Sequence, residues 1–554
     1  MENINMQNFM VSLIKNKIAK ALTCIVSLIL GSVTYSYAAV IPSGTQLADK
    51  QEITRNNFSE PVSLDPHKSD SSSEFDILRD FFERMVAIDK KDKIIPALAE
   101  RWETNDNKTW VFHLRKGIKW SDGSPITAHD VVFSWRRMVT PDTISPYGSY
   151  LVQATVVNAY DVLSGKKKPE ELGVKALDDA TIEVTLGRPK ADLLQMMAHP
   201  VMSPISEKVV KKYGNKWTQP EFFVSNGPFK LSEWIVNEKI VGVRNPYYWD
   251  DKHTVINKVT YLPLSDYKAD LNRYMAGELD ISNGGPSDFF PTLKKKFGDQ
   301  FHISPIMSVY YYLFNTQKPP FNDVRVRQAL TLALDRAIIT DKVLGNGQKP
   351  AFDVVYPGSG GIFLKHPDYA SWTQEQRVAK AKSLLNEAGF NENNSLKFTL
   401  LYNTSDGHKK IAIAASSMWK KNLGVEVVLQ NQESKSLYDT MSQGNFEVVR
   451  YAWNADYNSP TSFLDIFTTG NTNNIPQYSN KEFDQWVLKA DETNDKIYYQ
   501  RALDILTQDS PAIPVYYYVR TKLVKPYVGG VHISPLGDIP TKDLYIINTR
   551  LHRK

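Results

Sequence analysis

The sequence predicts a mixed α/β protein with segregated antiparallel pieces and more than one lobe. Short stretches of alternating apolar and polar residues recur along the 554-residue chain, between stretches with helical spacing of apolar residues. The pattern at residues 396–430 predicts a strand, a helix and a strand in succession, which implies a parallel pair joined by a right-handed crossover. Length alone suggests roughly three to four domains.

Each element follows from a local signal. Thr127 precedes an apolar run and has Asp130 three residues later, so it predicts the N-cap of a helix. Gly345 is expected to end the helix before it, because glycine readily adopts the left-handed conformation of a helix C-terminus. The predicted strands are 109–114, 181–186, 396–401 and 425–430, and the other predicted helices are 325–343, 375–389 and 409–422.

The first 38 residues have the pattern of an export signal. Three lysines precede an apolar run at 21–33, and Ser36-Tyr37-Ala38 supplies a small-x-small cleavage site. The apolar run has about 13 residues, fewer than the roughly 20 that cross a bilayer. We therefore expect export to the periplasm, cleavage after Ala38 and no direct insertion into the membrane.

The remaining composition excludes several classes of partner. Cys24 is the only cysteine and lies inside the apolar run, which disfavours lipid attachment and leaves the mature chain without a disulfide. A chain of this length can nevertheless bury a sufficient core. The signal carries three lysines and one glutamate, so the mature chain has a formal net charge of +3. Such a nearly neutral chain gives no support to binding of nucleic acid or of an anionic membrane surface.

Motifs for catalysis and metal binding are missing from the sequence. The chain contains no Gly-x-Ser-x-Gly or His-Glu-x-x-His, and its ten histidines are scattered. We therefore expect a protein that is not an enzyme and that uses no metal and no cofactor. An exported hydrolase stays open as an alternative, because paired carboxylates can meet in space without a sequence motif.

The stretch RYAWNADYNSPTSF, at 450–463, is the most informative for function. It places Asp456 among aromatic and amide side chains, near Arg450 and without an adjacent nucleophile. Desolvated opposite charges suit a ligand that carries both an ammonium group and a carboxylate, such as a peptide. Two alternatives remain open: Asp456 is a structural carboxylate in a turn before Pro460, or it forms a structural ion pair with Arg450.

The segment LAERWETNDNKTWVFHLRKGIKWSDGSPITAHDVVFSWRR, at 98–137, resembles the signature region of solute-binding proteins of peptide ABC importers. The resemblance runs almost end to end and includes SLDPHK at 63–68, QKPPFNDVRVRQAL at 317–330 and PVYYYVRTKLVKPYVGG at 514–530. This group is solute-binding protein family 5. Within it, the resemblance is strongest to the oligopeptide-binding and murein-peptide-binding branches.

The resemblance implies a fold like the type II periplasmic-binding proteins, with two lobes built from three domains, a hinge and a ligand cleft between the lobes. A peptide would lie extended in this cleft and pair with protein backbone as an added strand, with its side chains in hydrated pockets. The implied divisions are a signal peptide (1–38), a discontinuous domain I (39–82, 207–307 and 525–554), domain II (83–206) and domain III (308–524).

The resemblance also implies roles for individual residues. Asp456 would pair with the α-ammonium group of the peptide, and Arg450 and His408 would meet the carboxylate of shorter and longer peptides. His408 has the alternative of a surface residue near a helix start. The other implied contacts are Trp453, Asn454 and Ala455 beside the carboxylate, Asp70, Ser71 and Ser72 on the peptide backbone, and Tyr147, Tyr311 and Tyr517 as aromatic walls. Only alternate tyrosines of each strand can face a cleft.

The chain departs from the family pattern at several positions. Ser308 and Asn454 stand where some relatives carry a cysteine pair, and Leu344 replaces a lysine suited to the carboxylate of very short peptides. Ser434 replaces a tryptophan and Met441 an arginine, which implies more open and less cationic pockets.

The function that these observations predict is capture of short oligopeptides for an ABC importer. We expect ligands of about two to five residues in extended form, with three or four favoured, and low side-chain specificity. The expected partners are the peptide and the membrane permease subunits of the importer, and the protein is expected to be a monomer. A murein-tripeptide or signalling-peptide binder on the same fold is the alternative, favoured by LGNGQKPA at 344–351 and FNTQK at 314–318.

Overall fold

The computed structural model describes residues 39–285 and 289–548. Residues Ala39–Lys554 form one compact unit, and the predicted signal peptide with Cys24 lies outside the described residues. In the described ranges, no helix combines the length and apolar character needed to cross a membrane.

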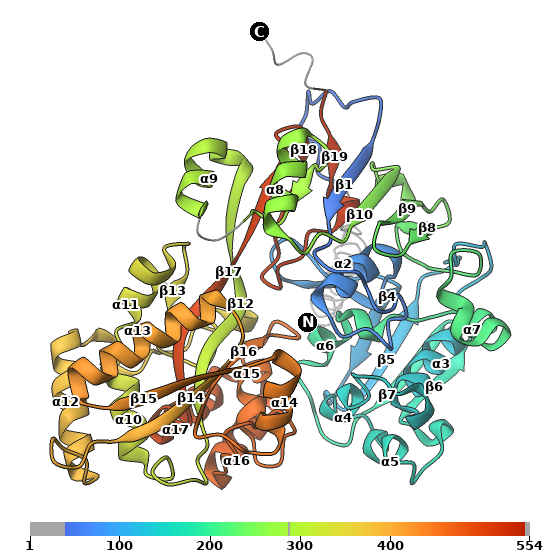
Figure 1. The fold of residues 1–554 in the computed structure, drawn as a ribbon. Helices are drawn as coiled ribbons and strands as arrows, with labels where there is room; N and C mark the ends of the chain where they lie inside the picture. The colour runs from blue at the N-terminus through green and yellow to red at the C-terminus, as the bar shows by residue number, and fades with distance from the viewer. Residues whose placement is uncertain (1–38, 286–288, 549–554) are drawn as a thin grey trace, which may run out of the picture. The chain divides into compact units, whose positions relative to one another are not determined.

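Eleven strands form one mixed sheet in the order β15-β14-β16-β12-β17-β11-β1-β10-β9-β8, with β13 added against β17. The long strands β12 and β17 pair with each other and connect β14–β16 to the strands around β1 (Figure 1). The strands are β1 (Glu52–Asn56), β8 (Phe229–Ile235), β9 (Lys239–Arg244), β10 (Lys258–Leu262), β11 (Ile281–Ser282), β12 (Phe301–Phe314), β13 (Lys349–Pro350), β14 (Lys397–Asn403), β15 (Glu426–Gln432), β16 (Val448–Asn454) and β17 (Ala512–Val524).

The predicted crossover unit is confirmed. β14 and β15 pair in parallel, with Lys397 opposite Glu426, and helix α13 (Asp406–Leu423) connects them. Gly424, with φ of +70°, ends the helix where the next strand begins. Together with the antiparallel sheets, this confirms the predicted mixed α/β class.

A second, antiparallel sheet has the order β4-β5-β7-β6. Its strands β5 and β7 confirm two predicted strands, and helix α3 (Ala128–Val139) begins at the predicted cap. The backbone N–H of Thr127 donates to Asp130 Oδ2 at 3.0 Å, and its hydroxyl donates to the same oxygen at 3.3 Å. The strands of the smaller sheets are β4 (Ala99–Thr104), β5 (Thr109–Leu114), β6 (Val174–Asp178), β7 (Thr181–Thr185), β2 (Val86–Ile88) with β3 (Ile94–Pro96), and β18 (Val528–Gly529) with β19 (Tyr545–Ile546).

The predicted helix 325–343 is wrong as a single helix. Helix α10 ends at Ala333, and Leu334 and Asp335 have extended backbone. The Asp335 side chain accepts hydrogen bonds from the N–H groups of Ala337 and Ile338, so it caps a new short helix instead of continuing the old one. The apolar spacing continues across this break, which is why periodicity alone does not reveal it.

The other α-helices are distributed along the chain. They are α2 (Ser72–Phe81), α4 (Tyr150–Gln153), α5 (Ala159–Leu163), α6 (Leu193–Met197), α7 (Glu207–Tyr213), α8 (Tyr267–Ala276), α9 (Phe290–Phe297), α10 (Val324–Ala333), α11 (Arg336–Ile338), α12 (Gln374–Glu387), α14 (Ser434–Ser442), α15 (Thr461–Leu464), α16 (Lys481–Thr493) and α17 (Lys496–Asp509).

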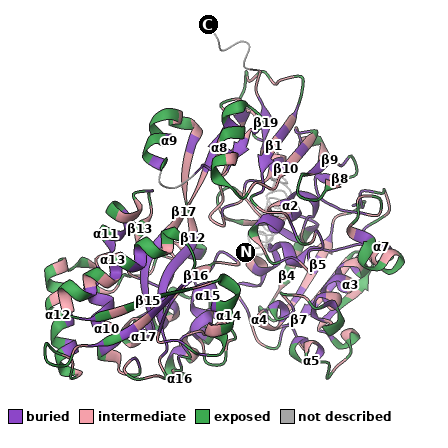
Figure 2. Cartoon of the chain, viewed as in Figure 1, coloured by how far each residue is buried: buried purple, intermediate pink, exposed green. Residues whose placement is uncertain are grey.

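The two faces of β12 belong to different hydrophobic cores. Tyr310 and Tyr312 pack in a core with Trp419, whereas Tyr311 packs on the opposite face with Phe463. Figure 2 shows that buried residues concentrate along these strands. This alternation, which follows from the period of two in a strand, decides which tyrosines lie beside Arg450. The three-domain division stays a prediction.

Candidate ligand-binding site

Asp456 lies in the turn between β16 and α15. The chain leaves β16 at Ala455, whose N–H donates to the carbonyl of Met307 at 2.8 Å. The N–H of Asp456 itself donates to Ser462 Oγ at 3.1 Å. Two consecutive backbone N–H groups, those of Ala455 and Asp456, are therefore held by the fold at the point where the carboxylate leaves the chain.

The Asp456 carboxylate has no cationic partner in the described ranges: no lysine, arginine or histidine nitrogen lies within 4.0 Å. Its partner is Tyr147, whose hydroxyl donates to Oδ1 at 3.3 Å from 309 residues away in the chain. Burial raises the pKa of Asp456 to about 6, and the hydrogen bond from Tyr147 opposes that rise. Asp456 is nevertheless only half-buried, so solvent still reaches part of this residue. The predicted alternative of a structural ion pair with Arg450 is wrong.

Aromatic rings surround the Tyr147 end of this contact. The Tyr147 ring stacks on His199 at 5.1 Å between centroids and meets Phe75 and Tyr150 edge-on, each at 5.7 Å. Burial holds the pKa of His199 well below its ordinary value, so this ring is neutral. An ionised Asp456 therefore lies in apolar surroundings with one side-chain hydrogen-bond donor, which favours an incoming ammonium group.

Arg450, on β16, is the cation of the site. Its guanidinium lies over the Tyr310 ring at 4.8 Å and donates to the Tyr518 hydroxyl at 2.6 Å and to Asn403 Oδ1 at 3.1 Å. Its Nε is buried without a hydrogen-bond partner. Burial alone would lower the pKa of Arg450, but the neighbouring tyrosines, Tyr518 first, raise it. In the part of the chain that the structure describes, no carboxylate oxygen lies within 4.0 Å of this guanidinium.

His408 lies beside Arg450, in the first turn of α13. Its ring centroid is 5.7 Å from that of Tyr310, and its Nδ1 is buried without a hydrogen-bond partner. Burial, and then the nearby Arg450 charge, lower the pKa of His408 to about 3. The imidazole is therefore neutral, and it would meet a carboxylate as a single N–H donor.

The structure separates the predicted tyrosines from Arg450. Tyr311 is fully buried, and its hydroxyl donates to the Val354 carbonyl at 2.6 Å. Tyr517 packs edge-on against Tyr356 at 5.3 Å, on the same side of the sheet as Tyr311. The tyrosines that contact Arg450 are Tyr518, a member of the 516–518 run that the resemblance implies as an aromatic wall, and Tyr310, which the sequence did not indicate as a site residue. The signal that identifies them is their alternation with Arg450 across the paired strands.

The segment flanking Asp456 is only partly accessible. Trp453 packs against the core that contains Tyr311, and its indole N–H donates to the Ser462 carbonyl at 2.6 Å. Asn454 is exposed and is the cross-strand partner of Ser308. The two positions where some relatives carry cysteines are therefore direct neighbours in the sheet.

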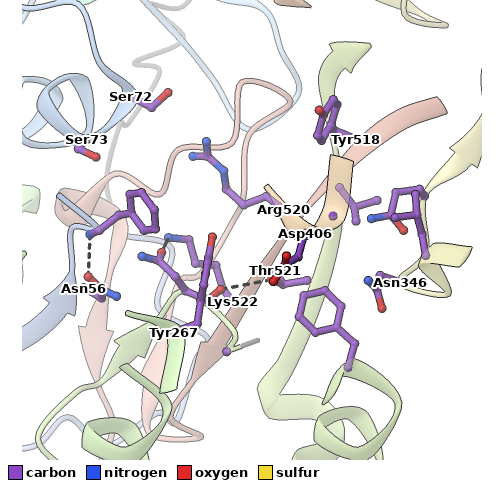
Figure 3. Close-up of a pocket in the computed structure, with 18 of the residues that line it drawn as sticks. Asn56, Ser72, Ser73, Tyr267, Asn346, Asp406, Tyr518, Arg520, Thr521 and Lys522 are labelled. Carbon is purple, nitrogen blue, oxygen red and sulfur yellow. Dashed lines mark hydrogen bonds between the residues drawn. The ribbon is translucent and has the colours of Figure 1, made fainter. Parts of the chain in front are cut away.

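Two backbone amides of the predicted backbone-pairing segment are engaged within the protein. The N–H groups of Asp70 and Ser71 donate to Glu74 Oε2 at 2.9 and 3.1 Å, and Ser71 caps helix α2. Ser72 is exposed and lines a cavity of about 650 Å³ that Leu344 also lines (Figure 3). Met441, in contrast, is buried in the core with Tyr311.

No cluster of three or more histidine, cysteine or acidic side chains suited to a metal ion occurs within residues 39–285 and 289–548. The site instead combines the Asp456 carboxylate and the Arg450 guanidinium, neither of which has an ion-pair partner in the described chain, with the neutral imidazole of His408.

Comparison with known proteins identifies the family. Residues 93–474 match the bacterial extracellular solute-binding proteins, family 5 (middle region). The chain belongs to this family. It is 50% identical over 516 residues to the periplasmic oligopeptide-binding protein OppA of Salmonella typhimurium, and this match covers 92% of this chain and 95% of that protein. It is 41% identical over 532 residues to the periplasmic murein peptide-binding protein MppA of Escherichia coli, with 95% and 99% covered.

Solved structures of the family have the same fold. Haemophilus influenzae OppA in complex with RPPGFSPFR superposes with a TM-score of 0.77 at 43% identity, covering 91% of this chain and all of that one. The unliganded open form of the murein tripeptide-binding protein MppA gives 0.80 at 40% identity, with 92% and 100% covered. The predicted family and type II periplasmic-binding fold are therefore confirmed.

Proposed function

We propose that this protein captures short peptides by their two charged termini, in the periplasm, and delivers them to the permease subunits of an ABC importer. One observation carries the proposal: Arg450 on β16 and Asp456 in the turn that follows β16 are opposite charges, six residues apart in the chain, without counterions in the described chain. A zwitterionic peptide neutralises both. The names of the relatives, OppA and MppA, support the same reading.

The peptide's ammonium group would pair with Asp456, and its carboxylate would meet Arg450 and His408. Because an extended peptide advances about 3.3 Å per residue, each added residue moves the carboxylate away from a fixed amine. Asn403 and Tyr518 hold the guanidinium in place before binding, which reduces the ordering cost of the complex. Recognition of termini and backbone leaves side chains largely unread, so we expect low side-chain specificity.

Calorimetry with Lys-Ala-Lys and its N-acetylated form tests this function. Removing one partner of a buried charge pair typically costs about 3–5 kcal/mol. We therefore expect Asp456→Ala to weaken binding by at least about a hundredfold, at 1.4 kcal/mol per tenfold. Acetylation should weaken binding to the unmodified protein by a similar factor. Asp299→Ala, at an exposed carboxylate on another part of the chain, is the control and should bind as the parent does.

An unchanged affinity in either the Asp456→Ala or the acetylation experiment would remove Asp456 from the site. Mass spectrometry of co-purified material supplies an independent result. Peptides with free N-termini support the proposal, whereas their hydrolysis during incubation would favour an exported hydrolase.

A murein-tripeptide binder is the second candidate, since the MppA structures superpose as well as that of OppA. Competition calorimetry of murein tripeptide against Lys-Ala-Lys separates the two ligands. We also propose that the protein acts as a monomer and that its signal peptide is removed after Ala38.

A further inference from the structure

The cavity of about 650 Å³ extends the candidate site beyond the carboxylate end. Tyr518, whose hydroxyl accepts a hydrogen bond from Arg450, forms part of its wall, and so does Gly407, the residue before His408. The opposite wall includes Asn56 and Tyr267 (Figure 3). The volume lies within the range of about 300–1,000 Å³ for ligand pockets. The cavity is therefore large enough for further ligand residues and begins where the shorter ligands would end.

Two cations of β17, Arg520 and Lys522, line this cavity. The Lys522 side chain is buried, with the residue 4% exposed, and its ammonium donates to Asn283 Oδ1 at 2.5 Å. An ammonium has three N–H donors, and this is the one acceptor that the described chain provides for Lys522. No carboxylate oxygen in 39–285 or 289–548 lies within 4.0 Å of it.

The two carboxylates whose charges act on Lys522, Asp270 and Asp76, have partners of their own. Asp270 accepts hydrogen bonds from Asn56 at 2.8 Å, from Ser282 at 2.7 Å and from the backbone of Asn283 at 2.9 Å. Asp76 lies 3.7 Å from the guanidinium of Arg79. These acids lower the local potential but do not form a close pair with Lys522.

Arg520 and Lys522 are alternate residues of one strand, so they lie on the same face. The Arg520 side chain extends from β17 toward the side of Ser72 and Ser73 (Figure 3), and its Nη1 donates to the Gly537 carbonyl at 2.8 Å. Burial, and then the Arg520 charge, lower the pKa of Lys522 to about 7. Two like charges held in a half-enclosed space are stabilised by an anion that contacts both.

We propose that this cavity is a second, more distant site for the peptide carboxylate, in which Lys522 and Arg520 bind the C-terminus of ligands too long to end at Arg450 or His408. The proposal rests on the proposed function, because it requires the amine to be fixed at Asp456. Anchors at successive distances from one fixed amine allow a single cleft to accept ligands of several lengths.

Binding at this site should depend on pH in a way that tripeptide binding does not. In the free protein Lys522 loses its proton above pH 7, whereas a bound carboxylate raises the pKa of the ammonium. Affinity for a long peptide therefore falls as pH rises above 7, by at most about tenfold per pH unit. The charged or titratable groups around Lys522 are Arg520 on β17, Arg55 on β1, Asp76 on α2, Asp270 on α8 and His302 on β12, which is the cross-strand partner of Lys522. Asp406 and Lys410 of α13 line the same cavity.

The test is calorimetry with Lys-Ala-Lys and with an octapeptide of alternating lysine and alanine, on the parent protein, Lys522→Met and Arg520→Gln. We expect each variant to bind the octapeptide at least about tenfold more weakly, which corresponds to loss of one charge-assisted contact. Binding of the tripeptide should change by less than about twofold, and this also shows that the variants fold. An octapeptide with a C-terminal amide should bind the parent weakly and should not respond to Lys522→Met.

An amidated octapeptide that ends in glutamate separates a terminal carboxylate from a side-chain carboxylate, and we expect it to bind as weakly as the plain amide. Equal losses for tripeptide and octapeptide, or equal affinity for the acid and amide octapeptides, would overturn the second site. Failure of the parent protein to bind Lys-Ala-Lys would instead overturn the proposed function.

Discussion

Replacing Asp456 by asparagine should stabilise the ligand-free protein at neutral pH. In the folded protein burial raises the pKa of Asp456 to about 6, whereas an unfolded aspartate titrates near 3.9. A carboxyl group with a higher pKa in the folded state favours folding while it is protonated. That contribution is complete below about pH 3.9 and is lost as pH rises through 6. At pH 7.5 the ionised group therefore costs stability, and asparagine removes the cost.

The pKa difference sets the size of the effect. About two pKa units at 1.36 kcal/mol each give an upper limit of about 3 kcal/mol at pH 7.5. Because the side chain keeps part of its surface accessible, solvent screening reduces this to about 1–2 kcal/mol. Asparagine retains an oxygen that can accept the hydrogen bond from Tyr147, so little should be lost in return.

The assay is urea unfolding of protein that has been unfolded and refolded to remove bound peptide. Midpoints are compared at pH 7.5 and pH 4.0, because a protein of this size need not unfold in one step. Asp456→Asn should raise the midpoint at pH 7.5, and the gain should shrink toward zero at pH 4.0. Asp299→Asn, at an exposed position, should leave the midpoint unchanged at both pH values.

A variant that is less stable than the parent at pH 7.5, or that gains as much at pH 4.0, would refute the electrostatic reasoning. The variant should also lose binding of Lys-Ala-Lys. Stability and binding would then change in opposite directions at one residue, as expected where a functional site holds a destabilising charge.

Other predictions concern the N-terminus and the ligand. Sequencing of the exported protein should give Ala39 as the first residue, and a lipid on Cys24 or an uncleaved chain would contradict this. Calorimetry should show tripeptides and tetrapeptides binding clearly better than dipeptides, because Leu344 offers no charge to the carboxylate of the shortest ligands. Equal affinity for dipeptides would contradict the proposed anchoring of the peptide carboxylate. In competition calorimetry murein tripeptide should bind no better than Lys-Ala-Lys, because the thioether of buried Met441 cannot form a bidentate pair with an extra carboxylate. A clear preference for murein tripeptide would favour the second candidate function.

Local signals in the sequence predicted local structure well. The capping box at Thr127 and the parallel unit of β14, α13 and β15 depend on contacts among near neighbours in the chain. The break at Asp335 was missed because an aspartate inside an apolar period can face solvent or cap a new helix, and periodicity does not distinguish the two. The choice is made by the side chain's hydrogen bonds to Ala337 and Ile338.

The candidate site was predicted in part. The residue types around Asp456 indicated a ligand with charged termini, but its contact with Tyr147 joins segments 309 residues apart and requires the fold. The tyrosines beside Arg450 depend on strand register, and the pairing of β12 with β17 shifts between Tyr310 and Tyr311. A shift of one residue exchanges the two faces of a strand. Sequence alternation alone therefore could not decide between Tyr310 and Tyr311.

The two unpaired charges also explain why termini, and not side chains, would decide which ligands bind. Asp456 and Arg450 each carry a charge that the described chain leaves without a counterion. A ligand with one blocked terminus relieves one of these charges and leaves the other desolvated, which costs more than leaving both in water. A zwitterionic peptide relieves both at once, whatever side chains it carries. On the proposed function, a preference for free termini would arise from the penalty on incomplete ligands, and broad side-chain acceptance would follow from the same arrangement.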